Sequence, residues 1–140
     1  MASLTPSNPA PADYVPPAWP GLYWPLPLHG GQATYLYSSS AIYRFTVLWT
    51  LVLFGAAHLA CAGYALAVQR RHWRVVWAVP VMYAVVGGLE AFVAGSVVGG
   101  LLGGVYTAGY FEMTTWMPFF WALISVLVLV LSSFAIQGGL

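Results

Sequence analysis

Apolar residues fall into three long runs that are separated by short polar segments. The first run covers residues 45–68, the second starts at 75, and the third covers 116–136. An α-helix rises 1.5 Å per residue, so a run of this length extends about 36 Å, enough for a tilted crossing of a hydrocarbon layer of about 30 Å. The polar segment 69–74 is so short that the first two helices must form an antiparallel hairpin. The pattern therefore predicts three membrane-spanning helices.

The later half of the second run is rich in glycine. Its glycines are Gly99, Gly100, Gly103 and Gly104. Each lowers helix stability by about 1 kcal/mol relative to alanine, although the apolar character continues to 105. We therefore expect a helix over 75–98, then a Gly-rich break, then a polar connection over 107–115. The predicted fold class is an all-α membrane protein, a three-helix transmembrane bundle.

The N-terminal arm, residues 1–43, differs in composition from the transmembrane domain, residues 44–140. It holds eight of the ten prolines, which fix φ and remove backbone donors, so an extended arm is expected rather than a helix or a strand ladder. Its tyrosines and tryptophans suit the headgroup level of a membrane. For residues 1–18 a disordered tail and an interfacial segment are both open, whereas interfacial contact is favoured for 19–43.

The composition excludes a soluble globular domain. Hydrophobic residues make up 61% of the chain and charged residues 5%, against about 25% charged in soluble domains. The lipid bilayer is therefore the expected partner, and a net charge of +1 gives no field that would attract nucleic acid. The sequence contains no nucleophile elbow, zinc-binding helix motif, cysteine pair or phosphate loop. No catalytic residue, cofactor or metal ligand is predicted, and the protein is not expected to be an enzyme.

The basic residues predict how the chain is oriented in the membrane. Arg70, Arg71 and Arg74 lie together in the first connection, whereas the second has only Glu112. Because cytoplasmic loops carry an excess of arginine and lysine, we expect residues 69–74 and the C-terminus to be cytoplasmic, and the arm to be luminal or exterior. Arg44, at the other end of the first helix, favours the opposite orientation, but it is a single positive charge against the three of the first connection.

Small residues recur every four positions along the second run. The row consists of Gly87, Ala91, Gly95, Gly99 and Gly103. Helical residues four apart lie on one face, and small side chains there let a second backbone approach closely. We expect this face to pack against the first or third helix; the alternative is a seam between copies of the chain or with other membrane proteins. No ring of polar residues supports a glycine-lined pore.

Two ionisable residues lie inside the apolar runs. His58 is near the middle of the first helix, and Glu90 is about 22 Å from the cytoplasmic end of the second, past the midplane toward the exterior. A lone carboxylate there costs about 2.5 to 3.5 kcal/mol and should face protein or water, or be protonated. Counted from the hairpin, the two residues differ in depth by about 9 Å, so direct pairing is allowed but not implied. Tyr83, Ser96 and water are equally available to Glu90.

Two roles are open for His58 and Glu90. One is a hydrogen-bonded clasp inside the bundle, and the other is a proton or ion relay, since both side chains can change protonation. The clasp is favoured, because a transporter usually shows internal repeats and several intramembrane polar groups. No repeat is visible in this sequence.

Several short motifs carry a family resemblance. They are Gly-Val-Tyr at 104–106, Glu-Met at 112–113 and Pro-Phe at 118–119, with weaker matches at Trp49, His58, Gly63 and His72. From about 44 to 138 the chain resembles the transmembrane protein 170 family, in a fungal-looking version. The resemblance implies a three-span protein of the endoplasmic reticulum and nuclear envelope, similar to proteins linked to shaping reticulum sheets and tubules and to nuclear pore organisation. It brings no active-site residues.

The sequence departs from the family in two places. Animal members need not carry an acid where Glu90 stands, and the spacing between Met113 and Pro118 is longer here. The first departure weakens a relay as a family mechanism, and the second leaves the luminal connection open. We therefore expect a non-enzymatic protein that organises or shapes these membranes. The alternatives are a small transporter or channel subunit that uses His58 and Glu90, and an accessory subunit of a larger complex.

Overall fold

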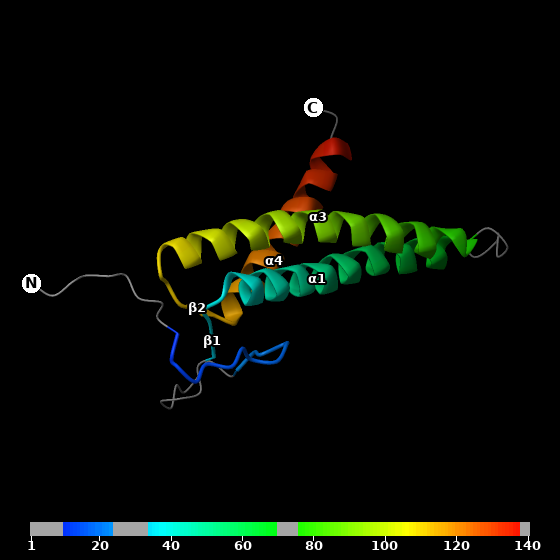
Figure 1. Cartoon of the computed structure of the whole chain (residues 1–140). Coiled ribbons are helices and arrows are strands. Elements are labelled where there is room, and N and C mark those ends of the chain that lie inside the picture. The colour runs from blue at the N-terminus through cyan, green and yellow to red at the C-terminus, as the bar shows by residue number, and fades with distance from the viewer. Residues whose placement is uncertain (1–9, 24–33, 70–75, 138–140) are drawn as a thin grey trace, which may run out of the picture.

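The computed structural model describes residues 10–23, 34–69 and 76–137, and three long helices dominate this part of the chain (Figure 1). They are α1 (Ser39–Val68), α3 (Ala78–Ala108) and α4 (Trp116–Gln137). In the described residues, all three are long and apolar enough to cross a membrane. The predicted all-α, three-span membrane fold is confirmed. The structure adds a sheet of two short strands, β1 (Tyr35–Leu36) and β2 (Met113–Thr114).

Helix α1 begins at Ser39, six residues before the predicted start at 45. The reason is a cap: the Ser38 hydroxyl accepts a hydrogen bond from the backbone N–H of Ala41 at 3.3 Å. A side-chain oxygen at this position satisfies one of the backbone donors that the first helical turn leaves free. The helix ends at Val68, where the apolar run also ends.

Helix α3 runs without interruption through the glycine cluster to Ala108. The predicted Gly-rich break after residue 98 is therefore wrong. In hydrocarbon an open backbone group costs several kcal/mol, which exceeds the cost of about 1 kcal/mol for each glycine in a helix. Gly99 and Gly103 also lie among the buried residues of α3, so tertiary packing supports the helix where its propensity is weak.

Helix α3 ends in a Schellman motif. The N–H of Phe111 donates to the carbonyl of Tyr106 at 2.9 Å, and the N–H of Tyr110 donates to Thr107 at 3.3 Å. The Tyr106 and Phe111 rings meet edge to face with centroids 6.3 Å apart, which is the apolar contact that usually accompanies this motif. Tyr110 takes the left-handed position, with φ 54°. The connection to α4 is therefore short and well bonded.

Helices α1 and α3 lie side by side and antiparallel, and α4 leans across them (Figure 1). Helix α4 packs chiefly against α1, and its C-terminal half leads away from the pair. We call the end at which α1 begins the cap end and the opposite end the hairpin end. The segment with Arg70, Arg71 and Arg74 lies outside the described residues, so the orientation prediction stays a prediction.

The cap end carries a small folded structure, the cap, which consists of residues 10–23, 34–38 and 109–115. Strands β1 and β2 pair antiparallel, with Tyr35 opposite Thr114 and Leu36 opposite Met113. Leu36 and Met113 are fully buried. They form a core with three buried residues from the first two turns of α1: Ala41, Ile42 and Phe45. Leu102 and Met117 pack against this core. The cap thus joins the arm to both ends of the α3–α4 connection.

The first described segment of the arm, residues 10–23, folds against the cap end. The Gly21 carbonyl accepts hydrogen bonds from the hydroxyls of Thr34 at 3.0 Å and Thr115 at 2.7 Å. The indole N–H of Trp116 donates to the carbonyl of Tyr23 at 2.9 Å. The segment contains no helix, as its prolines predict, but it is held in place by residues almost a hundred positions away. Residues 1–9 and 24–33 lie outside the described part.

Candidate functional site

The small residues of α3 form its contact with α1. The buried residues of α3 are Gly87, Ala91, Gly95, Gly99 and Gly103, the same five that recur every four positions in the sequence. We call this contact the glycine seam. A Cβ placed on Gly95 would lie 3.0 Å from the Cα of Val47, and one on Gly99 would lie 3.2 Å from the carbonyl oxygen of Tyr43. The two backbones therefore approach as closely as glycine allows.

Three glycines of the next row of α3 do not contact α1. A Cβ on Gly88, Gly100 or Gly104 would meet nothing within 4 Å. The seam is therefore one stripe of the helix, and in this chain α1 fills it. A second copy of the chain would have to use a different face.

Hydroxyl groups along the seam are satisfied locally. Thr46 donates to the carbonyl of Ile42 at 2.8 Å, and Thr50 donates to that of Thr46 at 2.7 Å, both one turn earlier in α1. The hydroxyls of Tyr43 and Ser96 lie 3.0 Å apart and link the two helices. Because buried polar groups cost free energy when unpaired, these bonds let α1 present threonines to the glycine stripe.

The structure brings His58 and Glu90 together at the seam. The Nε2 atom of His58 lies 3.4 Å from Oε2 of Glu90. The expected depth difference of about 9 Å does not keep them apart, because side chains lean toward the N-terminus of their own helix. In an antiparallel pair the two side chains lean toward each other along the axis. The His58 ring also lies directly over Gly87, where a Cβ would be 2.5 Å from its Cγ.

The hydrogen bonds of His58 define where its proton lies. Its Nδ1 is 2.9 Å from the carbonyl oxygen of Phe54, and because a carbonyl only accepts, Nδ1 carries a hydrogen. The other ring nitrogen, Nε2, is the one that faces Glu90, at 3.4 Å from Oε2.

Glu90 lies close to the middle of α3 and is partly open to the outside. Its side chain is 44% exposed, whereas that of His58 is 15% exposed. The middle of the helix Ala78–Ala108 is Val93, so Glu90 lies about 4.5 Å from it, on the hairpin side. The expectation that Glu90 lies past the membrane midplane toward the exterior stays a prediction.

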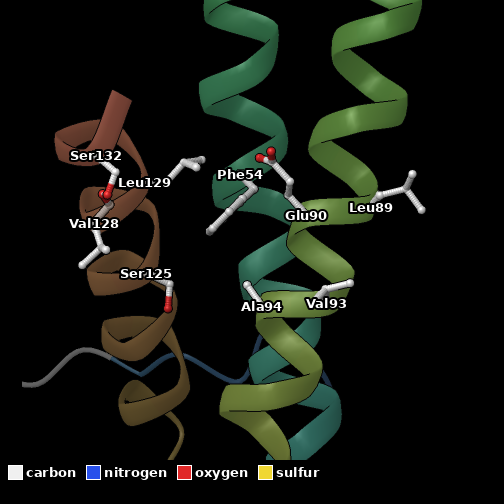
Figure 2. A pocket seen from close by; sticks show the side chains of 9 residues that line it. All are labelled: Phe54, Leu89, Glu90, Val93, Ala94, Ser125, Val128, Leu129 and Ser132. Atoms are coloured by element: carbon white, nitrogen blue, oxygen red, sulfur yellow. The ribbon is translucent and has the colours of Figure 1, made fainter. Parts of the chain in front are cut away.

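A groove of about 570 Å³ opens beside Glu90, between α3 and α4 (Figure 2). Figure 2 shows α4 on one side, α3 on the other and Phe54 of α1 behind them. The lining residues are Phe54, Leu89, Glu90, Val93, Ala94, Ser125, Val128, Leu129 and Ser132. A smaller cavity of about 190 Å³ adjoins His58 and is lined also by Met82, Tyr83 and Val86. The pair therefore lies between two hollows in the bundle surface.

Comparisons with known proteins identify the family. The sequence model of the family described as "Transmembrane protein 170A/B-like" matches residues 35–140. The chain belongs to this family. It is also similar to a Saccharomyces cerevisiae protein described as "Uncharacterized protein YPR153W", with 35% identity over 139 residues, which covers 99% of each chain. No solved structure matches the chain.

The more specific motifs of the transmembrane protein 170 resemblance lie at the cap end. Tyr106 and Met117 pack against the cap core, and Met113 is part of it. Pro118, at the start of α4, is fully buried. The motif residues thus hold together the end of α3, strand β2 and the start of α4. In this family member the more specific motifs build the cap end, whereas His58, a weaker match, belongs to the ion pair.

A charged contact completes the surface of the cap. The hydroxyl of Tyr37 donates to Oε2 of Glu112 at 3.2 Å. Loss of hydration raises the pKa of Tyr37, and the nearby Glu112 carboxylate raises it further. The hydroxyl of Tyr14 donates to the carbonyl of Tyr35 at 3.0 Å, and loss of hydration raises the pKa of Tyr14 as well. Both tyrosines therefore stay neutral and serve as hydrogen-bond donors.

Sequence reasoning missed the groove and the cap. Ser125 and Ser132 are seven residues apart on α4, which places them on one helical face, and this spacing was a readable signal. The sequence did not indicate that Phe54 would line the groove, because this depends on how far α4 leans from α3. The bonds of Gly21 and Tyr23 to residues 115 and 116 join segments that are far apart in the chain.

Proposed function

We propose that this member of the transmembrane protein 170 family is a non-enzymatic protein that organises or shapes membranes of the endoplasmic reticulum and nuclear envelope. Family membership supports the proposal, and the resemblance to proteins linked to reticulum shape supports the location. The observation that carries it is the folded cap. The arm and the α3–α4 connection fold together at one end of the bundle, where β1 and β2 pair.

The proposed mechanism is a difference in width between the two ends of the bundle. A bundle with a folded cap at one end displaces more membrane area in one leaflet than in the other, and the bilayer responds by bending or by sorting the protein. Aromatic residues at the cap end, such as Trp19 and Trp116, suit the headgroup level at which this wedge acts. With the hairpin loop in the cytoplasm, as Arg70, Arg71 and Arg74 favour, the wide end faces the lumen.

Deletion of the gene and imaging of the reticulum test the proposal. We expect the proportions of sheets and tubules to change, and the full-length chain to restore them. A chain that lacks residues 1–37, and so lacks β1 and the arm, should reach the membrane without restoring them. Unchanged proportions, together with a location elsewhere in the cell, would refute the proposal.

A second candidate, a small transporter or channel subunit, is favoured by one observation. The contact between His58 and Glu90 lies between the two hollows, where a proton or a small solute would meet it. Purified protein in liposomes should then move protons, and Glu90→Gln should abolish the flux while the protein stays folded. Absence of flux, or a variant that only loses yield, would leave the pair as a clasp.

A further inference from the structure

Three tyrosines of the cap line a pocket of about 250 Å³, which we call the tyrosine pocket. Tyr35 and Tyr37 are two positions apart on one side of the chain, whereas Leu36 between them is buried in the cap core. The ring of Tyr14 meets that of Tyr37 edge to face with centroids 4.8 Å apart, and the Tyr35 and Tyr37 centroids are 6.4 Å apart. Further walls come from the arm: Pro11, Val15 and Pro17.

The hydroxyl groups at the pocket are largely bonded to the protein already. That of Tyr14 donates to the carbonyl of Tyr35 at 3.0 Å, and that of Tyr37 donates to Glu112 at 3.2 Å. The hydroxyl of Thr34, which also lines the pocket, is bonded within the cap as well. The pocket therefore presents a ligand chiefly with ring faces and aliphatic carbon.

The charge of the cap favours a cation. Residues 10–23, 34–38 and 109–115 contain two carboxylates, Asp13 and Glu112, and no arginine, lysine or histidine. The faces of tyrosine rings carry negative partial charge and attract cations. Because the Glu112 carboxylate accepts the hydrogen bond of Tyr37, it polarises this ring further in the same direction. An anion would find no positive side chain in the cap.

The hydrogen bonds within the pocket decide which kind of cation fits. A primary ammonium group has three N–H donors, which lose their bonds to water in a pocket of ring faces and carbon, and this costs free energy. A quaternary ammonium group has no N–H, and its methyl groups suit contact with rings, prolines and valine. Aromatic sites recognise choline in this way. A pocket of about 250 Å³ holds several water molecules and so has room for a trimethylammonium group.

The position of the pocket indicates where such a cation comes from. Tyr37 is two residues before the start of α1, and Glu112 is four residues before the start of α4, so the pocket lies at the ends of the spans (Figure 1). Helices α1 and α3 have 30 and 31 residues and extend about 45 Å, which matches a bilayer with its headgroups, about 40 to 45 Å thick. The cap therefore lies at the level of phospholipid headgroups, where the quaternary ammonium group is choline.

We propose that the tyrosine pocket binds the trimethylammonium group of a phosphatidylcholine headgroup. The acyl chains of this lipid lie in the bilayer beside the helices, and its choline group reaches into the cap. The proposal rests on the cap and on the membrane spans and not on the role in membrane shape. Either proposal can therefore fail while the other stands.

Lipid binding by the full-length protein in maltoside micelles tests the proposal. Native mass spectrometry counts the bound lipid for a series with identical acyl chains: phosphatidylethanolamine, its monomethyl and dimethyl forms, and phosphatidylcholine. The headgroup nitrogen keeps its charge through the series while its N–H groups are replaced by methyl groups. We expect the affinity to rise along the series, so that phosphatidylcholine binds about tenfold more tightly than phosphatidylethanolamine.

An uncharged lipid separates attraction to a cation from filling of the pocket. In this analogue a carbon atom replaces the choline nitrogen, so the shape of the headgroup is kept and the positive charge is lost. We expect it to bind about tenfold more weakly than phosphatidylcholine. Free phosphocholine or a trimethyl-lysine peptide, at the same concentration as the lipid, should leave phosphatidylcholine bound.

Substitutions at Tyr35 locate the binding site. Tyr35→Phe keeps the ring and should bind phosphatidylcholine as the natural chain does. Tyr35→Leu keeps an apolar side chain without a ring face, so it should bind phosphatidylcholine about tenfold more weakly and lose the preference over phosphatidylethanolamine. Tyr64→Leu, at an exposed position of α1 toward the hairpin end, is the matched control and should change neither.

Three results would overturn the proposal. The first is equal binding of phosphatidylcholine and either phosphatidylethanolamine or the uncharged analogue by the natural chain, which stands whether or not a variant folds. The second is a folded Tyr35→Leu variant that keeps the preference for phosphatidylcholine. The third is displacement of the lipid by free phosphocholine or by the trimethyl-lysine peptide, which would assign the pocket to a soluble ligand or a protein partner.

Discussion

At the scale of single residues, two tryptophans at the cap end differ in one hydrogen bond. The indole N–H of Trp116 donates to Tyr23, whereas that of Trp49 is buried and has no partner among the described residues. A hydrogen bond contributes about 1 kcal/mol net. We therefore expect Trp116→Phe to lower the free energy of unfolding about 1 kcal/mol more than Trp49→Phe. Thermal melts of both variants in detergent measure this; an equal loss would mean that the Tyr23 contact adds no stability.

Tyr110 is held in a backbone conformation that favours glycine. Its φ of 54° lies in the left-handed region, where a side chain costs about 1 kcal/mol or more. We expect Tyr110→Gly to be about 1 kcal/mol more stable than Tyr110→Ala, because both lose the ring and only glycine relieves the backbone. Denaturation of the two variants side by side provides the measurement. Equal stability would show that α3 does not end in this motif.

Also at this scale, the sequence indicated that His58 and Glu90 needed partners but not that they would pair. Counting residues from the hairpin measures where Cα atoms lie, whereas the contact depends on the opposite lean of the two side chains. The position of Glu90 along α3 also depended on where that helix ends.

At the scale of helices, the sequence predicted the glycine seam correctly, whereas the break that it predicted at the glycines of α3 is wrong. Small residues that recur every four positions mark one helical face whatever packs against it, so the stripe could be predicted. Whether glycines 99 and 103 end the helix depends on α1, which packs against them. Helix propensity measured in water therefore gave the wrong end for α3.

The seam predicts a sharp difference between neighbouring glycines. Gly95→Leu and Gly99→Leu would push α1 away and should lower the melting temperature in detergent by many degrees. Gly100→Leu, where a Cβ meets nothing within 4 Å, should leave it unchanged or raise it, since leucine is the better helix former. Val97→Leu, on an exposed face, is a second control. Equal melting temperatures for all four would mean that the bare face meets only lipid.

At the scale of the whole molecule, the three spans were predictable and the cap was not. Long apolar runs report membrane spans directly, because a bilayer requires continuous helices. The cap instead rests on pairings between residues about eighty to ninety positions apart, such as Thr34 with Thr115 and Tyr23 with Trp116. The prolines of the arm predicted neither a helix nor a strand ladder, but α1 begins within the arm at Ser39 and β1 pairs with β2. The feature that carries the proposed function is thus visible only in the fold.

The most direct test of this account is the density of the labelled protein on membrane tethers drawn from giant vesicles. If the cap makes one end of the bundle wider, the natural chain should be enriched on the tether relative to the flat membrane when the cap faces the convex leaflet, and depleted when the orientation is reversed. A chain that lacks residues 1–37 should show neither effect. Equal density on tether and flat membrane for the natural chain, in both orientations, would contradict the account.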